Sequence, residues 1–239
     1  MPGGQARHEW LTAQPYAHRG LHGADTAENS LAAFRAAIAH GHGIECDVRL
    51  SRDGVAHIFH DRRLERLTGS SGSFAALTAQ DIAALRLPGG DEVVPPLSAL
   101  LALAPETPLL IEIKSDAGPL SCARLCAAVG HDLAGHAGPA AIMSFDPVAV
   151  HWFARHRPAI ARGLVVSRRH RTGLVARQGA ALAIARAKPH FIACDVRDLP
   201  TACALPRRLG VPLLCWTVRT PRDRARAARV DKPIFESMA

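Results

Sequence analysis

Short apolar runs alternate along this chain with stretches in which apolar residues recur every three or four positions. The first pattern predicts buried β-strands, and the second predicts helices that pack one face on a core. Alternation of the two is typical of a parallel α/β sheet, and eight strands favour a closed (β/α)8 barrel of the TIM type over an open sheet. The eight expected strands cover residues 16–20, 44–50, 56–60, 109–113, 140–145, 162–166, 191–194 and 212–218.

Helices are expected between most of these strands. The first begins at Leu31, with Asn29 or Ser30 as its candidate N-cap and Gly41 beyond its end. The others are expected over residues 77–85, 97–103, 122–129, 148–155, 174–187 and 222–229.

One connection is too short for a helix. Only residues 51–55 separate the second and third expected strands, and Asp53-Gly54 within them is a strong turn signal. A parallel crossover needs about ten or more residues, so we expect an irregular barrel here, with a hairpin or an extended second strand. Residues 61–108 are expected to form a loop and short helices on the active face of a single domain spanning 1–239.

Composition supports a globular enzyme-sized domain. The 239 residues are 48% hydrophobic, so a sizeable core is available. No apolar run reaches the roughly 18 residues of a membrane span, and residues 1–14 lack the apolar stretch of a secretory signal. The six cysteines show neither CxxC pairs nor the framework of a small disulfide-rich domain. Cys122 and Cys126 could share a helix face, but burial as apolar side chains is the preferred interpretation. These features together predict a reduced, cytoplasmic protein.

The formal net charge of +8 raises the question of a nucleic-acid partner. Only Lys114, Lys188 and Lys232 are lysines, and the many arginines are spread through alanine-rich helical stretches. No aromatic interleaving or nucleic-acid-binding motif accompanies them, so a solvated helix face is the preferred interpretation. The positive field would still attract anionic substrates.

Ionisable residues gather where four of the expected strands end. The groups are His18-Arg19-Gly20, Glu45-Cys46-Asp47, His60-Asp61 and Glu112-Ile113-Lys114. Glu45 and Asp47 lie two residues apart, so both carboxylates point to the same face of a strand. With Glu112 from a later strand they offer hard oxygen ligands, which suit Mg²⁺ or Ca²⁺ better than zinc. Two imidazoles, an arginine and a lysine beside such an ion would form a site for a phosphate ester.

In these groups, and over nearly its whole length, the sequence resembles the glycerophosphodiester phosphodiesterase family. The matching text is AHRG at residues 17–20, ENSLAAF at 28–34, GIECDVRLSRDG at 43–54, HD at 60–61, LERLTG at 64–69, PL at 96–97 and IEIK at 111–114. Weaker matches follow at 144–145, 163–165 and 215–218. The resemblance implies a TIM-type barrel that uses a divalent metal to hydrolyse glycerophosphodiesters to glycerol 3-phosphate and an alcohol.

The resemblance also implies roles for individual residues. Glu45, Asp47 and Glu112 would bind the metal, and His18 and His60 would act as the acid/base pair. Arg19, Lys114 and Trp216 would contact the substrate, the first two at the phosphate and Trp216 as a wall for the glycerol moiety. Which histidine is the acid, and whether water or the glycerol hydroxyl attacks first, stays open.

The sequence departs from the family pattern at its C-terminal end. Arg219 stands where asparagine is usual, and the usual Thr-Asp-x-Pro ending is replaced by the text from Asp231 to Ala239. Two other functions are compatible with the same barrel. One is a lysophospholipase D-like phosphodiesterase, which would need an apolar trough for an acyl chain, and the other is a non-catalytic barrel that binds phosphate esters.

Overall fold

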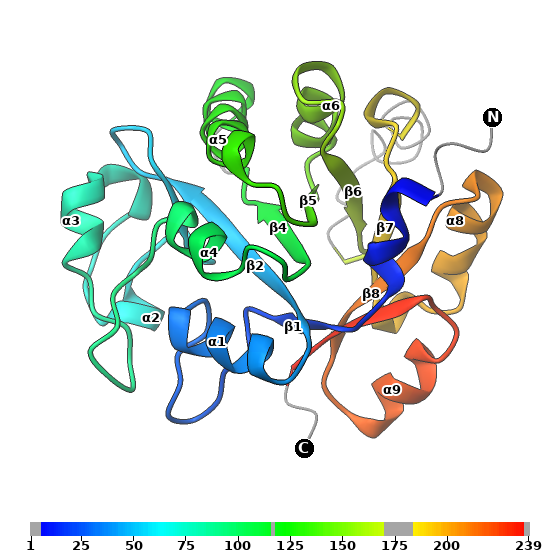
Figure 1. Cartoon of the computed structure of the whole chain (residues 1–239), viewed down its shortest axis with the longest axis horizontal. Helices are drawn as coiled ribbons and strands as arrows, with labels where there is room; N and C mark the ends of the chain where they lie inside the picture. Colours follow the sequence, from blue (N-terminus) through cyan, green and yellow to red (C-terminus); the bar gives the residue numbers. More distant parts are fainter. Residues whose placement is uncertain (1–5, 116–117, 170–183, 237–239) are drawn as a thin grey trace.

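The computed structural model describes residues 6–115, 118–169 and 184–236, and within them nine strands form one sheet. Strand β1 pairs in parallel with both β2 and β9, so eight parallel strands close into a barrel with the helices outside (Figure 1). The predicted TIM-type fold is therefore confirmed. The strands are β1 (Tyr16–His18), β2 (Gly43–Leu50), β3 (Ala56–Ile58), β4 (Leu109–Ile113), β5 (Ala140–Ser144), β6 (Ala161–Val166), β7 (Phe191–Asp195), β8 (Leu213–Val218) and β9 (Lys232–Phe235).

The membership of the barrel differs from the expectation at one strand. The third expected strand, β3, is antiparallel to β2 and lies outside the ring, because the connection over residues 51–55 permits only a hairpin. Its place in the ring is taken by β9, between β8 and β1. The sequence pattern did not predict β9, because this strand is short and begins with Lys232 and Pro233.

The observed helices follow most of the expected segments. They are α1 (Leu31–Ala39), α2 (Glu65–Thr68), α3 (Ala79–Ala83), α4 (Leu97–Leu103), α5 (Pro119–Asp132), α6 (Pro147–His156), α8 (Ala204–Leu209) and α9 (Pro221–Ala227). Ser30 caps α1, as one of the two candidates. Helix α3 is shorter than expected because a capping box between Thr78 and Asp81 fixes its start. Most of the helix expected over residues 174–187 lies outside the described residues.

The strands separate two apolar clusters. Outward-facing side chains of β2, such as Ile44, Cys46 and Val48, pack with the surrounding helices. A second cluster, with Leu110, Phe191 and Leu214, fills the barrel. All six cysteines are buried and free, and for Cys122 and Cys126 this burial was expected. Alternation along β2 therefore leaves Glu45 and Asp47 facing inward.

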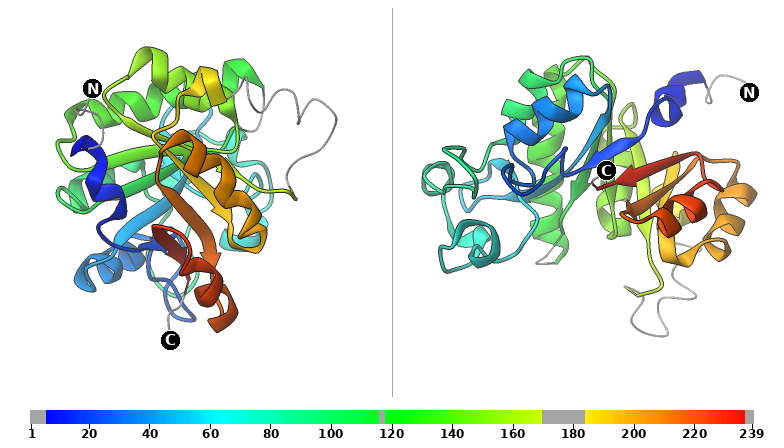
Figure 2. Two further views of the ribbon diagram at one scale, coloured as in Figure 1. Left: turned by 90° about the vertical axis from the view of Figure 1, so that its right-hand side faces the viewer. Right: turned by 90° about the horizontal axis from the view of Figure 1, so that it is seen from below.

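Two segments extend the barrel. The 3₁₀ segment η1 (Ala6–Thr12) places Leu11 in the cluster inside the barrel, before β1 begins. Residues between β3 and β4 form α2, the 3₁₀ turn η2 (Phe74–Ala76) and α3, which project from one side of the barrel (Figure 2) and surround their own small core. No helix in the described ranges is both long and apolar enough to span a bilayer.

Candidate active site

The register of the parallel strands brings the predicted residues together. His18, the last residue of β1, lies opposite Glu45 on β2, and Asp47 lies opposite Glu112 on β4. One carboxylate oxygen from each of Glu45, Asp47 and Glu112 lies within 4.8 Å of the other two, and all three residues are buried. The three carboxylates predicted to bind a metal therefore form one compact cluster.

Two cations and an amide surround this cluster. Lys114 Nζ is 2.6 Å from Glu112 Oε1 and 2.9 Å from Asp47 Oδ1. Arg19 Nε is 3.1 Å from Asp47 Oδ2, to which Asn29 Nδ2 also donates at 3.0 Å. Burial alone would favour the neutral form of Asp47, but the charges of Lys114 and Arg19 outweigh it and hold its pKa well below the usual range. Asp47 is therefore ionised and well compensated.

Glu45 is compensated much less. Among the described residues, its Oε2 accepts the backbone N–H of Arg19 at 3.1 Å and its buried Oε1 has no hydrogen-bond partner. Burial and the neighbouring charges of Asp47 and Glu112 raise the pKa of Glu45 well above the usual range. Burial likewise raises the pKa of Glu112. The shortage of positive charge and the unpaired oxygen fit a divalent cation with oxygen ligands.

The backbone determines where Arg19 points. Strand β1 ends at His18, and both Arg19 (φ 58°) and Gly20 (φ 79°) adopt the left-handed conformation. Because the strand ends before the arginine, this turn places the guanidinium over the carboxylates. Its Nη1 lies 2.7 Å from Glu28 Oε1, so Arg19 forms ion pairs with both Glu28 and Asp47.

Each histidine of the predicted acid/base pair contacts a carboxylate through Nδ1. The partner of His18 is Glu236 Oε1 at 2.5 Å, and the partner of His60 is Asp61 Oδ1 at 2.6 Å. Burial lowers the pKa of both imidazoles, although the carboxylates oppose this shift. His18 Nε2 lies 3.9 Å from Glu45 Oε2, so its second nitrogen faces the acidic cluster.

A cavity of about 600 Å³ opens above the cluster. Seven of the eight predicted site residues line it, namely His18, Arg19, Glu45, His60, Glu112, Lys114 and Trp216. Trp216 donates through Nε1 to the Ala193 carbonyl at 3.3 Å and packs edge-on against Phe145, which also lines the cavity. The cavity thus has a charged side and an aromatic side.

Several residues of the site were missed by the sequence analysis. Arg66 bridges Asp61 to Glu28, and Arg219 binds Glu236. The matching ENS text at residues 28–30 was a usable signal for Glu28 and Asn29. Glu236 gave no signal, because β9, the strand that it follows, was not predicted.

Comparison with known proteins gives a consistent result. The sequence model of the glycerophosphoryl diester phosphodiesterase family matches residues 18–232. A Mycobacterium tuberculosis protein named probable glycerophosphodiester phosphodiesterase 2 is 41% identical over 100 residues, which make up 41% of this chain and 38% of that protein. The chain thus aligns with well under half of the length of this curated relative.

Two solved structures share the fold over nearly the whole chain. An Oleispira antarctica phosphodiesterase in complex with the product sn-glycerol-3-phosphate superposes with a TM-score of 0.79 at 21% identity, over 95% of this chain and 94% of that one. A glycerophosphodiester phosphodiesterase from Thermotoga maritima gives a TM-score of 0.75 at 22% identity, over 93% and 94%.

Proposed function

Because the chain belongs to the glycerophosphoryl diester phosphodiesterase family, whose sequence model matches residues 18–232, we propose that it hydrolyses glycerophosphodiesters to glycerol 3-phosphate and an alcohol with a divalent metal. One observation carries this proposal. Three buried carboxylates form one cluster, and two of them line a single cavity together with two cations and two imidazoles.

Glu45, Asp47 and Glu112 would hold the ion, Mg²⁺ or Ca²⁺. Three carboxylates against Arg19 and Lys114 leave a formal charge of −1, since −3 + 2 = −1. A divalent ion changes that charge to +1, which matches the single negative charge of a phosphodiester. When bound, such an ion supplies Lewis-acid stabilisation of the charge that develops on the phosphate.

The cations and aromatic residues would bind the substrate. Arg19 offers a planar guanidinium suited to two phosphate oxygens, and Lys114 adds a point charge. Trp216, with Phe145 packed edge-on against it, provides the wall for the glycerol moiety.

His18 and His60 would move the protons. Both line the cavity, and burial favours the neutral imidazole in each. One ring, as the neutral imidazole, accepts the proton of the attacking water or glycerol hydroxyl. The other ring must be the imidazolium, which its carboxylate partner stabilises, and it donates a proton to the departing alkoxide. Acid/base help of this kind contributes about 10²–10⁴ in rate, so His18→Ala and His60→Ala should each lower kcat at least about a hundredfold.

Turnover of glycerophosphocholine with and without EDTA tests the proposal. We expect release of glycerol 3-phosphate that EDTA abolishes and that Mg²⁺ or Ca²⁺ restores. Turnover that is confined to lysolipids would instead support the lysophospholipase D-like function. Binding without turnover of either substrate would support a non-catalytic barrel.

A further inference from the structure

The carboxylate of Glu236 connects three parts of the barrel wall. Glu236 follows β9, the strand that closes the ring, and its Oε1 lies 2.5 Å from Nδ1 of His18 at the end of β1. Arg219, which follows β8, donates from Nε to Glu236 Oε2 and from Nη2 to Oε1, at 2.5 and 2.7 Å. One carboxylate after β9 therefore contacts donors that lie at the ends of β1 and β8, the two strands that flank β9.

This arrangement fixes the state of both groups. Burial opposes ionisation of Glu236, but the hydrogen bonds from His18 and Arg219 outweigh it and hold its pKa well below the usual range. An ionised carboxylate has only acceptors, so the Nδ1 nitrogen of His18 must carry the proton of this contact. In the neutral ring the lone pair then lies on Nε2, which faces Glu45 at 3.9 Å.

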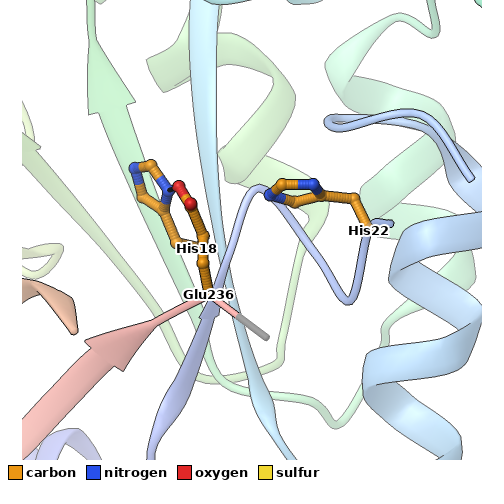
Figure 3. Close-up of side chains that lie close together, drawn as sticks. All are labelled: His18, His22 and Glu236. Atoms are coloured by element: carbon orange, nitrogen blue, oxygen red, sulfur yellow. Dashed lines mark hydrogen bonds and ion pairs between the residues drawn. The ribbon is translucent and has the colours of Figure 1, made fainter. Parts of the chain in front are cut away.

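Two of these residues could instead belong to a metal site. His22 lies beside His18 and Glu236 (Figure 3), and one ligand atom from each of the three lies within 4.8 Å of the others. The buried Nε2 of His22 has no hydrogen-bond partner within residues 6–115, 118–169 and 184–236. Two histidines and a carboxylate could bind a transition metal. However, Oε1 of Glu236 already contacts His18 and Arg219, its Oε2 accepts from Arg219 Nε, and the charge of Arg219 would repel a cation. The contacts therefore favour a positioning role.

We propose that Glu236, itself held by Arg219, is a positioning residue that fixes the tautomer and orientation of His18 so that Nε2 faces the reacting phosphate. The proposal rests on the proposed phosphodiesterase function only for its effect on the rate. It belongs to a general pattern in which a carboxylate on one imidazole nitrogen orients the other nitrogen for proton transfer or ligation.

The first readout is the tautomer of His18, which needs neither metal nor substrate. In protein labelled with ¹⁵N-histidine, at a pH where the ring is neutral, we expect the Nδ1–H form in the wild type. His18→Ala assigns the signals. Glu236→Ala should shift His18 toward the Nε2–H form.

Asp231→Asn is a matched control, because Asp231 accepts from Leu213 N and supports the join between β8 and β9 without touching His18. This variant should lower Tm and leave the tautomer unchanged.

The second readout is kinetic. Glu236→Gln and Glu236→Ala should lower kcat by about 10–100-fold, the usual effect of losing such a supporting carboxylate, while KM changes less than about threefold. In a His18→Ala background, Glu236→Gln should cause no further loss, because its effect passes through His18. His22→Ala should leave kcat within about twofold of wild type.

Each contrary result has a distinct meaning. An unchanged His18 tautomer in Glu236→Ala, or a full additional loss from Glu236→Gln in the His18→Ala background, would overturn the positioning role. Binding of Zn²⁺, measured by calorimetry, that disappears in His22→Ala would replace it with a metal site. If the wild type shows no phosphodiesterase turnover, the proposed function fails, and the tautomer comparison still decides the contact between Glu236 and His18.

Discussion

Arg19 illustrates how a backbone conformation can decide the chemistry of a side chain. On a continuing strand its guanidinium would point away from His18. The positive φ of Arg19 and Gly20 turns it over the carboxylates instead. A side chain at Gly20 would also meet the backbone of Ala33 at 2.8 Å, so glycine is needed there for space as well as conformation. The guanidinium contacts Asp47 and Glu28, which leaves two roles to distinguish, charge balance and phosphate binding.

Arg19→Lys separates these roles. A lysine keeps the positive charge but loses the planar pair of donors, so a bidentate phosphate contact should not survive. We expect kcat/KM to fall at least about tenfold, since each tenfold corresponds to roughly 1.4 kcal/mol, the order of one charge-assisted hydrogen bond. Arg35→Lys, at the exposed pair with Glu92, is the control and should have no effect. Near-normal kcat/KM in Arg19→Lys would limit Arg19 to balancing charge.

Glu45 should have opposite effects on stability and on metal binding. Its raised pKa means that its contribution to the stability of the metal-free protein is present below the ordinary glutamate pKa and is lost as the pH rises through the raised value. At pH 8 the carboxyl of Glu45 is less favourable in the folded protein than in the unfolded chain, and Glu45→Gln removes this cost, so the metal-free Tm should rise by at least about 2 °C. The same change removes an anionic ligand, and the affinity for the divalent ion should fall at least about tenfold.

Thermal denaturation in EDTA and metal titration by calorimetry measure the two effects of Glu45→Gln. Glu92→Gln is the matched control, since Glu92 accepts a backbone N–H from Ala32 near the surface and lies outside the cluster. A lower metal-free Tm in Glu45→Gln would mean that the charge of Glu45 is compensated within the protein, and the argument for an ion based on its unpaired oxygen would fail.

The two C-terminal departures from the family pattern turn out to be in contact. Arg219 and the residues from Asp231 onward each looked like a loss of a familiar feature. In the structure Arg219 donates to Glu236, and the same carboxylate contacts Nδ1 of His18. Only the closed barrel reveals this contact, because Arg219 follows β8 and Glu236 follows β9.

At the scale of elements, the sequence predicted strands such as β2 and β4, in which nearly every residue is buried. Strand β4 has the expected bounds, because all five of its residues are buried and apolar neighbours flank Glu112. Strand β9 was missed because only Ile234 and Phe235 of its four residues are buried. Its β identity comes from pairing with β1 and β8, which are distant in sequence. Long-range pairing of this kind leaves no local pattern.

Packing inside the barrel depends on a glycine in β6. A Cβ built on Gly163 would lie 2.3 Å from the ring of Phe191, which faces Gly163 in the register between β6 and β7. Because both residues are buried, the ring has little room to move. We expect Gly163→Ala to destabilise the fold by about 1–3 kcal/mol, as overpacking typically does.

Chemical denaturation measures the change in the free energy of unfolding for Gly163→Ala. Gly90→Ala is the control, because no atom lies within 4 Å of a Cβ at that position and its effect should be small. An unchanged stability in Gly163→Ala would mean that Phe191 has another rotamer available and that the barrel interior is less tightly packed than its distances indicate.

The site depends on the whole ring because its residues come from strands far apart in sequence. The sequence grouped His18, Glu45, Asp47 and Glu112 by chemistry and by their places at strand ends. Their actual proximity arises from two registers, β1 with β2 and β2 with β4. The supporting residues Arg66 and Glu236 required the fold itself, since their partners lie 38 and 218 positions away.

The net charge of the whole chain should influence how fast anionic substrates arrive. The chain carries a formal charge of +8, and Arg62 and Arg219 line the cavity together with Arg19 and Lys114. A positive field of this kind attracts anions and is screened by salt, with a Debye length of about 10 Å at 0.1 M ionic strength.

Glycerophosphoglycerol carries one negative charge, whereas glycerophosphocholine is zwitterionic with no net charge. We therefore expect kcat/KM for glycerophosphoglycerol to fall severalfold between about 0.02 and 0.2 M salt, with kcat nearly constant. The fall for glycerophosphocholine should be much smaller. Steady-state kinetics over a series of NaCl concentrations at saturating metal provides the measurement. Equal salt dependence for the two substrates would show that screening acts on the phosphate contacts within the site, and long-range attraction by the net charge would then have no part in substrate capture.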